Sequence, residues 1–234
     1  MALPFFFEEN LNNEPIFILN EETSKHIALV LRMQKGENLK ITDGKGHLLT
    51  CEIINENKKA TEVKVVTTEI QQPPIKKIAI AISLIKNNSR FEWFLEKATE
   101  IGVAEIIPML CERTKKQHFR YDRMRNILIS AMLQSQQTWL PHLHSLSAFK
   151  KVVELKNHTQ KFIAHCDGNA KESLISQMDN SAVSTVVLIG PEGDFTESEI
   201  KIAHENNFIS TSLGSTRLRT ETAGMVAIVM LNRP

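Results

Sequence analysis

Residues 183–196 read VSTVVLIGPEGDFT. Their first half is an almost continuous run of β-branched and aliphatic side chains, which predicts a strand buried on both faces of a parallel sheet. Gly190 and Gly193 then flank a Pro-Glu pair, so the backbone can turn sharply and approach a ligand closely. Thr196 and Glu199 have the spacing of a capping box that begins a helix. We therefore expect a strand, a ligand-binding turn and a helix; a plain strand-to-helix turn is the alternative.

Strands and helices alternate on both sides of this stretch. We expect strands at residues 78–84, 104–110, 161–165, 183–189 and 209–213. We expect helices at residues 90–101, 123–137, 170–177, 198–205 and 222–231. The alternation predicts an α/β domain with a parallel sheet, because parallel strands need crossover connections that are usually helical.

Residues 1–70 have a different pattern, which indicates a small β-barrel. We expect strands at residues 5–7, 16–19, 39–43, 48–55 and 60–68. One helix is expected at residues 21–33, where Ile27, Val30 and Leu31 fall at helical spacing. Asp43-Gly44-Lys45-Gly46 predicts a hairpin turn. Gln71-Gln72-Pro73-Pro74 is the expected linker, because proline interrupts helices and strands, and it separates domains at residues 1–72 and 73–234.

Residues 213–223, which read LGSTRLRTETA, are a second candidate ligand loop. Open parallel sheets bind ligands at the carboxyl ends of their strands, and this segment follows an expected strand. A helix that begins here, with Thr220 as its cap and Glu221 favoured by the helix dipole, accounts for part of the pattern. Arg217 and Arg219 are poorly placed at a helix N-terminus, and an anionic partner such as phosphate explains them better.

Residues 111–125, which read CERTKKQHFRYDRMR, form a local basic segment. The whole chain has a net charge of only +1, so a nucleic-acid site has to be a local patch of this kind. Its cations are suited to neutralise phosphates, and Phe119 and Tyr121 to stack on bases. A solvated loop and helix face is the alternative.

Several kinds of site are excluded. The chain has neither the G-x-G-x-x-G fingerprint of dinucleotide-binding folds nor a P-loop. Cys51, Cys111 and Cys166 lack metal-ligand spacing, and we expect all three to be reduced and buried. His142 and His144 have no carboxylate or cysteine beside them in the sequence, so we expect no metal site.

The composition is that of a globular protein, with 42% hydrophobic and 24% charged residues in a chain of 234. The N-terminal MALPFFFEEN lacks the basic start and the long apolar run of a signal peptide. No apolar run reaches the roughly 18 residues that a membrane span needs. We therefore expect a cytoplasmic protein without a membrane partner.

Several motifs, taken together, resemble one known family. Residues 97–108 read KATEIGVAEIIP, residues 189–195 read IGPEGDF, and residues 213–223 contain LG and LRTETA. Val30-Leu31-Arg32 and the Asp-Gly-Lys-Gly hairpin near the N-terminus also match. In this order, and over nearly the whole chain, they resemble the 16S rRNA (uracil-N3) methyltransferases of the SPOUT superfamily.

The resemblance implies a PUA-like β-barrel that binds RNA at residues 1–72. It implies a SPOUT α/β domain with a trefoil knot and a parallel sheet at residues 73–234. The expected activity is transfer of a methyl group from S-adenosylmethionine to N3 of a specific uridine in 16S rRNA, free or in the small ribosomal subunit, by a homodimer. A SPOUT enzyme acting on another RNA position, such as a ribose 2′-hydroxyl, and a non-catalytic RNA-binding assembly protein are the alternatives.

The resemblance also implies roles for individual residues. Those expected to surround S-adenosylmethionine are Gly190, Glu192, Gly193, Leu213, Gly214, Leu218 and Thr222. Those expected to bind RNA are Arg32 and Lys45 and, from the charge of the basic segment, Arg113, Lys115, Lys116 and Arg120. We expect Arg219, with Arg32, to stabilise the developing uracil anion or a nearby phosphate. Glu221 is the candidate base, or else a carboxylate that caps the helix.

Two segments depart from the family's pattern. Family members often carry a basic residue just before the aromatic residues of the first strand, whereas Met1-Ala2-Leu3-Pro4 has none. The usual Gln-Ser-Gly-Arg segment reads Gln134-Ser135-Gln136-Gln137 and lacks the arginine. The basic side chains that would contact RNA at these two places are therefore missing.

Overall fold

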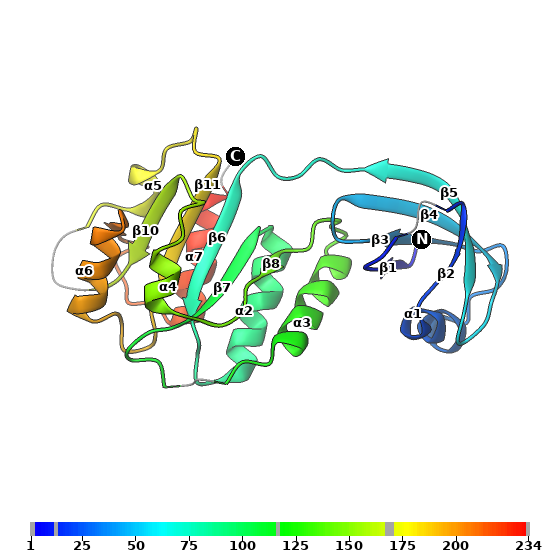
Figure 1. Cartoon of the computed structure of the whole chain (residues 1–234), viewed down its shortest axis with the longest axis horizontal. Helices are drawn as coiled ribbons and strands as arrows, with labels where there is room; N and C mark the ends of the chain where they lie inside the picture. The colour runs from blue at the N-terminus through cyan, green and yellow to red at the C-terminus, as the bar shows by residue number, and fades with distance from the viewer. Residues whose placement is uncertain (1–2, 12–13, 116–117, 167–170, 233–234) are drawn as a thin grey trace. The chain divides into compact units, whose positions relative to one another are not determined.

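The computed structural model describes residues 3–11, 14–115, 118–166 and 171–232. The chain forms two compact units, Met1–Pro73 with Met132–Leu140, and Pro74–Ala131 with Pro141–Pro234 (Figure 1). The first division falls between the two prolines of the expected linker. The later segment joins the first unit at its hairpin, where Gly46 N donates to Thr138 O and Leu140 N donates to Gly44 O, both at 2.9 Å.

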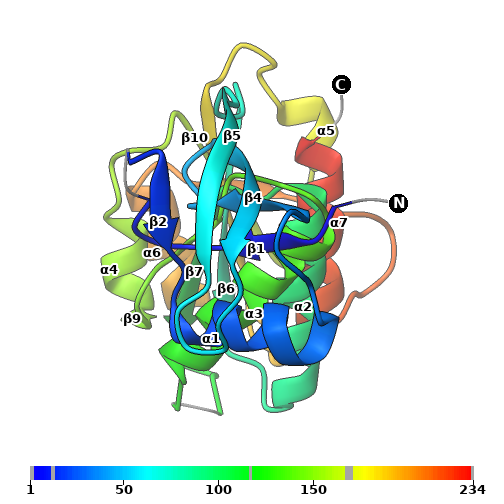
Figure 2. The ribbon, with the colours of Figure 1, turned by 90° about the vertical axis from the view of Figure 1, so that its right-hand side faces the viewer.

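The first unit is a curled five-stranded sheet, a half-barrel (Figure 2). Its strands are β1 (Phe5–Phe7), β2 (Ile16–Ile18), β3 (Asn38–Thr42), β4 (His47–Asn55) and β5 (Glu62–Ile70), in the order β1-β3-β4-β5-β2. Its buried side chains form a core that includes Leu39, Ile41 and Ile53. The predicted hairpin is confirmed, because β3 and β4 are antiparallel and Gly44 and Gly46 take φ angles of 70° and 96°.

The helix expected at residues 21–33 forms, but it changes type along its length. α1 (Glu21–Lys25) continues into a π-helix, η1 (His26–Leu31), which ends at Arg32 with a left-handed φ of 54°. Of the three apolar residues expected on one face, Ile27 is buried, whereas Val30 and Leu31 are 68% and 43% exposed. The wider π turn explains the difference, because residues at α-helical spacing no longer share a face.

The second unit is built on a sheet whose strands all pair in parallel, as predicted. The strands are β6 (Lys77–Ser83), β7 (Glu105–Leu110), β8 (His142–Leu143), β9 (Ser147–Ala148), β10 (Gln160–Ala164), β11 (Ser184–Ile189) and β12 (Ile209–Thr211). Their order is β12-β10-β11-β6-β7-β8, and β9 also pairs with β7. The short β8 and β9 were not predicted, since two residues carry no periodicity. The trefoil knot stays a prediction.

Helices cover both faces of this sheet (Figure 1). They are α2 (Asn88–Ile101), α3 (Tyr121–Gln134), α4 (Phe149–Val153), α5 (Leu174–Gln177), α6 (Glu197–Glu205) and α7 (Thr220–Leu231). α4 was not predicted, and α5 begins later than expected; the start of the expected helix, at residue 170, lies outside the described residues. α7 packs on α2, β6 and β11, whereas α4 contacts β7 and α6.

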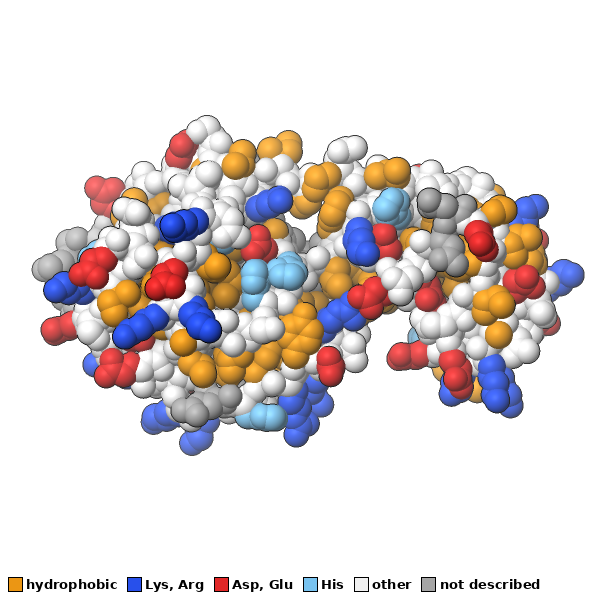
Figure 3. Space-filling model, viewed as in Figure 1, with side chains coloured by type: hydrophobic (Ala, Val, Ile, Leu, Met, Phe, Trp, Pro, Cys, Tyr) orange, Lys and Arg blue, Asp and Glu red, His pale blue; other side chains and the backbone are white. Residues whose placement is uncertain are grey.

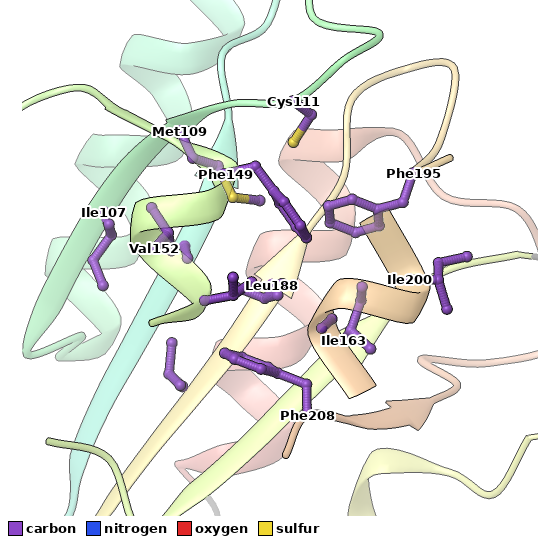
Figure 4. Close-up of a cluster of buried hydrophobic side chains, with 14 of the residues drawn as sticks. Ile107, Met109, Cys111, Phe149, Val152, Ile163, Leu188, Phe195, Ile200 and Phe208 are labelled. Atoms are coloured by element: carbon purple, nitrogen blue, oxygen red, sulfur yellow. The ribbon is translucent and has the colours of Figure 1, made fainter. Parts of the chain in front are cut away.

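The central strand β6 divides its side chains between the two helical layers. Ala79 and Ala81 belong to a buried cluster with Phe149, Leu188 and Phe208 under α4 and α6 (Figure 4). Ile82 points the other way, and its Cδ1 lies 3.3 Å from where a Cβ of Gly224 in α7 would stand. The strand is therefore apolar on both faces, which explains its continuous hydrophobic sequence.

Gly224 lets α7 pack closely against α2. A Cβ at this position would lie 2.6 Å from Cε2 of Phe94, and the Phe94 ring is completely buried. The absence of a side chain in the middle of a helix is therefore a packing requirement, although glycine is an unfavourable helix residue.

We predict that Gly224→Ala destabilises the protein. Alanine gains up to about 1 kcal/mol in helix propensity, but overpacking a rigid core costs about 1–3 kcal/mol, so we expect a net loss of unfolding free energy. Chemical denaturation measures this loss. The double variant Gly224→Ala with Phe94→Leu should recover part of it, because the smaller side chain removes the clash. A single variant as stable as the wild type would contradict the packing argument.

Candidate functional site

Three strand ends meet at the carboxyl edge of the parallel sheet and form a pocket. β10 lies between β11 and β12, so the segments that follow these strands emerge side by side. The pocket has a volume of about 610 Å³ and is lined by parts of residues 164–171, 189–194 and 211–223. Both loops identified from the sequence therefore contribute to one site, as expected for an open parallel sheet.

Most of the residues expected to bind the cofactor line this pocket. They are Gly190, Glu192, Leu213, Gly214 and Leu218. Gly193 and Thr222 are not among its described lining residues. Lining residues that sequence reasoning missed include Ala164, His165, Cys166, Lys171 and Asp194. Ala164 ends β10 and the next three of these residues follow it, in a segment that we did not identify as a binding loop from the sequence.

The loop after β11 has the predicted local structure. Thr196 Oγ1 accepts from Glu199 N at 3.3 Å, and Glu199 Oε2 accepts from Thr196 N at 2.9 Å, so the capping box is confirmed. Gly190 is also needed for space, because a Cβ there would lie 3.0 Å from the buried ring of Phe195. The loop therefore folds back on its own first residue.

Asp194 joins this loop to the end of β10. Its φ is 64°, a left-handed conformation that is uncommon outside glycine but tolerated by aspartate. One carboxylate oxygen accepts from Phe195 N at 2.8 Å, and the other accepts from Cys166 N at 2.7 Å. Because Asp194 and Cys166 both line the pocket, this carboxylate fixes the distance between two of its walls.

We predict that Asp194→Gly lowers the unfolding free energy by about 1–3 kcal/mol, since two backbone N–H groups lose a charged acceptor. Glycine accepts the left-handed φ, so this variant separates the lost hydrogen bonds from backbone strain. Asp194→Ala should be less stable still, because it adds that strain. Chemical denaturation compares the three proteins. A glycine variant as stable as the wild type would show that the carboxylate bridge contributes nothing.

The loop before α7 differs from its prediction in one respect. Thr220 is the first residue of the helix and not its cap, which is Arg219. The Thr220 hydroxyl instead donates to the buried carbonyl oxygen of Gly190 at 3.0 Å. The prediction that Thr220 caps α7 is therefore wrong, because a contact with the other pocket loop takes the hydroxyl. This hydrogen bond ties the two loops together.

The charged residues of this loop have different environments. Arg217 and Arg219 are exposed and line the pocket, where an anionic group could reach them. Glu221 is buried in the first turn of α7, and its Oε1 lies 3.7 Å from Arg90 Nε. It is not among the described lining residues of the pocket.

The basic segment begins directly after β7. Arg113, Lys115 and Arg120 are exposed, and Lys116 lies outside the described residues. On the face drawn in Figure 3, basic and acidic side chains are interspersed. In the first unit, Lys45 at the hairpin and Arg32 at the end of η1 are both exposed.

The two aromatic residues of the segment contact other residues of the second unit, although Tyr121 remains 38% exposed. The Phe119 ring contacts the rings of Phe91 and Tyr121 edge to face. The Tyr121 hydroxyl donates to Leu143 O at 3.1 Å. These contacts anchor the segment, and they favour a structural role for both rings over the base stacking expected from the sequence.

The cysteines differ in exposure. Cys51 and Cys111 are buried as expected, and all three thiols are free. Burial raises the pKa of the Cys51 thiol to about 12, and burial, reinforced by the Glu199 carboxylate, raises the pKa of Cys111 further. Both thiols are therefore poor nucleophiles. The expectation that Cys166 is buried is wrong. Cys166 is exposed, because it follows β10 in the loops at the carboxyl ends of the strands.

Two further findings concern the described part of the chain alone. It contains no group of three or more His, Cys, Asp or Glu side chains placed to hold a metal ion. None of its helices is long and apolar enough to cross a membrane.

Comparison with known proteins identifies the family. The RNA methyltransferase domain family matches residues 71–232, and the RNA methyltransferase PUA domain family matches residues 19–66. The ribosomal RNA small subunit methyltransferase E of Mesomycoplasma hyopneumoniae is 30% identical, over 94% of this chain and 95% of its own.

Solved structures agree in sequence and in fold. A probable rRNA methyltransferase from Porphyromonas gingivalis is 33% identical with a TM-score of 0.89, over 97% of this chain and 96% of that one. The ribosomal RNA small subunit methyltransferase E of Neisseria gonorrhoeae, solved with S-adenosyl methionine bound, is 28% identical with a TM-score of 0.85, over the same two shares. With its half-barrel, its parallel sheet and its pocket at the carboxyl edge, the chain belongs to the RNA methyltransferases of the small-subunit methyltransferase E family, within the SPOUT superfamily.

Proposed function

We propose that this protein transfers a methyl group from S-adenosylmethionine to N3 of a uridine in 16S rRNA. The observation that carries the proposal is the pocket where the two motif loops meet. Its volume of about 610 Å³ lies within the range of small-molecule and cofactor sites. The relatives named above, one of them with the cofactor bound, support the assignment.

The pocket residues suit S-adenosylmethionine in chemical type. Leu213 and Leu218 offer apolar surface for an adenine, and the glycine-containing loops bring main-chain hydrogen-bonding groups close to it. Glu192 and Asp194 place carboxylates in the lining, which favours a cationic ligand. When bound, the cofactor supplies an electrophilic methyl group on a sulfonium.

Arg219 is proposed to act on the acceptor base. Uracil N3 carries a weakly acidic proton, and its loss to water leaves negative charge on N3 and the two carbonyl oxygens beside it. A guanidinium at the pocket wall stabilises that charge as it develops, and Arg217 beside it can hold a neighbouring phosphate. The N3 edge is paired in a duplex, so the target has to be single-stranded or flipped out.

The geometry favours the second of the two roles considered for Glu221. Its carboxylate is buried in the first turn of α7 and lies close to Arg90 on α2. There it balances the helix dipole and the guanidinium charge. We therefore propose that Glu221 supports the start of α7 and that Arg219 acts at the reacting end of the pocket.

We predict that Arg219→Ala lowers turnover by roughly 100-fold, the scale of losing one donor that stabilises developing negative charge. The measurement is methyl transfer from labelled S-adenosylmethionine to small-subunit RNA. The Kd for the cofactor alone should change little, because the interaction forms with the uracil. Arg217→Ala is the matched control and should mainly raise the KM for RNA. Near-normal turnover of Arg219→Ala would contradict the role of this residue.

RNA binding is proposed for the half-barrel and the basic segment. Residues 1–72 form the proposed RNA-binding domain and residues 73–234 the methyltransferase domain. The half-barrel would contribute Arg32 and Lys45, and the basic segment Lys115, Lys116 and Arg120. Such cations neutralise phosphates and position the RNA, whereas the pocket selects the base. The small ribosomal subunit is the proposed partner, in the cytoplasm.

A homodimer is proposed from the outer face of α7. This helix is apolar on nearly all sides, yet Val229 is 51% exposed and Met225 and Met230 are half-buried. On the adjoining helix α2, Trp93 is 45% exposed. A helix of this composition is normally covered all round, and a second copy of the chain would cover it here. Ala223 of the same helix lines the pocket, so the partner would lie near the donor site.

The dimer predicts a specific effect of Val229→Glu. A charge on this face should prevent association, so light scattering should give half the wild-type mass while circular dichroism stays unchanged. Ile209→Glu is the matched control, because Ile209 is also exposed, at 54%, but lies on β12. A wild type that is already monomeric at micromolar concentration, or a Val229→Glu protein of unchanged mass, would contradict the dimer.

A further inference from the structure

We propose that Arg113 is a positioning residue for the loop at residues 190–196 and not an RNA ligand. The inference rests on the proposed function, in which this loop forms part of the donor site. Arg113 Nη1 donates to Gly193 O at 2.7 Å and to Phe195 O at 3.4 Å. The side chain therefore spans the far end of the loop and binds its backbone at two points.

Gly193 is the partner that makes this contact possible. A Cβ at Gly193 would lie 3.3 Å from Arg113 Cδ and 3.6 Å from Arg113 Cβ. The aliphatic part of the Arg113 side chain therefore packs directly against Gly193, and a larger residue there would press on it. Although Gly193 belongs to the sequence motif, it does not line the pocket. Contact with Arg113 explains why this position holds a glycine, which cofactor binding alone does not explain.

The turn that carries Arg113 is itself held firmly. Thr114 Oγ1 accepts from Cys111 N at 2.8 Å, and it lies 2.8 Å from the buried hydroxyl of Ser83 at the end of β6. This pair of contacts anchors the turn to two central strands of the sheet. The backbone from which the Arg113 side chain extends toward the loop is therefore held in place.

A second link joins the same turn to the same loop. Glu112 N donates to Glu199 Oε1 at 2.8 Å, and Glu112 Oε2 accepts from Thr196 Oγ1 at 3.0 Å. Thr196 and Glu199 are the capping box of α6, so this link holds the C-terminal end of the loop. Arg113 holds the part before it. The loop is then constrained from Gly193 onward, a stretch that includes the pocket-lining residue Asp194.

Arginine is better suited to this role than lysine. Both contacts come from Nη1, whose two N–H groups are held in the guanidinium plane and point at the carbonyls of Gly193 and Phe195. A lysine ammonium keeps the charge that would attract a phosphate, but its side chain is one bond shorter and its donors are not held in a fixed plane. The substitution Arg113→Lys therefore separates a positioning role from a phosphate contact.

The test compares Arg113→Lys, Arg113→Met and the control Lys115→Met. Calorimetry without RNA should show the Kd for S-adenosylmethionine raised roughly tenfold or more in both Arg113 variants, and unchanged in Lys115→Met. Hydrogen exchange should accelerate at least several-fold in a peptide covering residues 190–197, again in the Arg113 variants alone. RNA binding should lose about one unit of salt-dependence slope in Lys115→Met, but not in Arg113→Lys.

The outcomes separate this inference from the proposed function. If the wild type binds no S-adenosylmethionine, the proposed function fails. The rate of hydrogen exchange in residues 190–197 still tests whether Arg113 positions the loop. If Arg113→Met folds poorly, Arg113→Lys carries the comparison. A cofactor Kd within twofold of the wild type in Arg113→Lys, with unchanged exchange, would overturn the positioning role. So would a loss of RNA affinity in Arg113→Met at unchanged cofactor affinity.

Discussion

The parallel register of β10 with its two neighbours is the constraint on which the site depends. Ala164, the last residue of β10, pairs with Ile189 of β11 and with Thr211 of β12. Each partner is also the last residue of its strand. The segments that follow these three strands therefore leave the sheet side by side at its carboxyl edge, although they are far apart in the sequence. A pocket forms there because the loops cannot diverge: Asp194 joins two of them, and Thr220 joins two through Gly190.

Charge is distributed unevenly around this pocket. The loop after β11 contributes Glu192 and Asp194, whereas the loop after β12 contributes Arg217 and Arg219. In the proposed reaction the donor is a cationic sulfonium and the acceptor becomes anionic, so a wall of each sign would suit both partners. The net charge of the chain is only +1, so the overall composition gives no sign of this local separation of positive and negative side chains.

The sequence predicted those parts of the site whose signals are local. Gly190, the capping box at Thr196 and the arginines before α7 depend on near neighbours in the chain, and the structure brings these segments to one pocket. Asp194 and Cys166 were missed as pocket residues, because their roles arise only when two strands become neighbours. Thr220 was misread as a cap for the same reason, since its hydrogen-bond partner lies in another loop. The methyl donor and the target base came from family resemblance, not from periodicity or composition.

Mass-spectrometric mapping of methylated nucleosides in small-subunit rRNA tests the central claim most directly. Cells that carry the gene should contain a uridine methylated at N3, and deletion of the gene should remove that methyl group while leaving other modifications in place. Re-expression of the wild-type chain should restore it. An unchanged N3-methyluridine content after deletion, or loss of a ribose 2′-O-methyl group instead, would contradict the account.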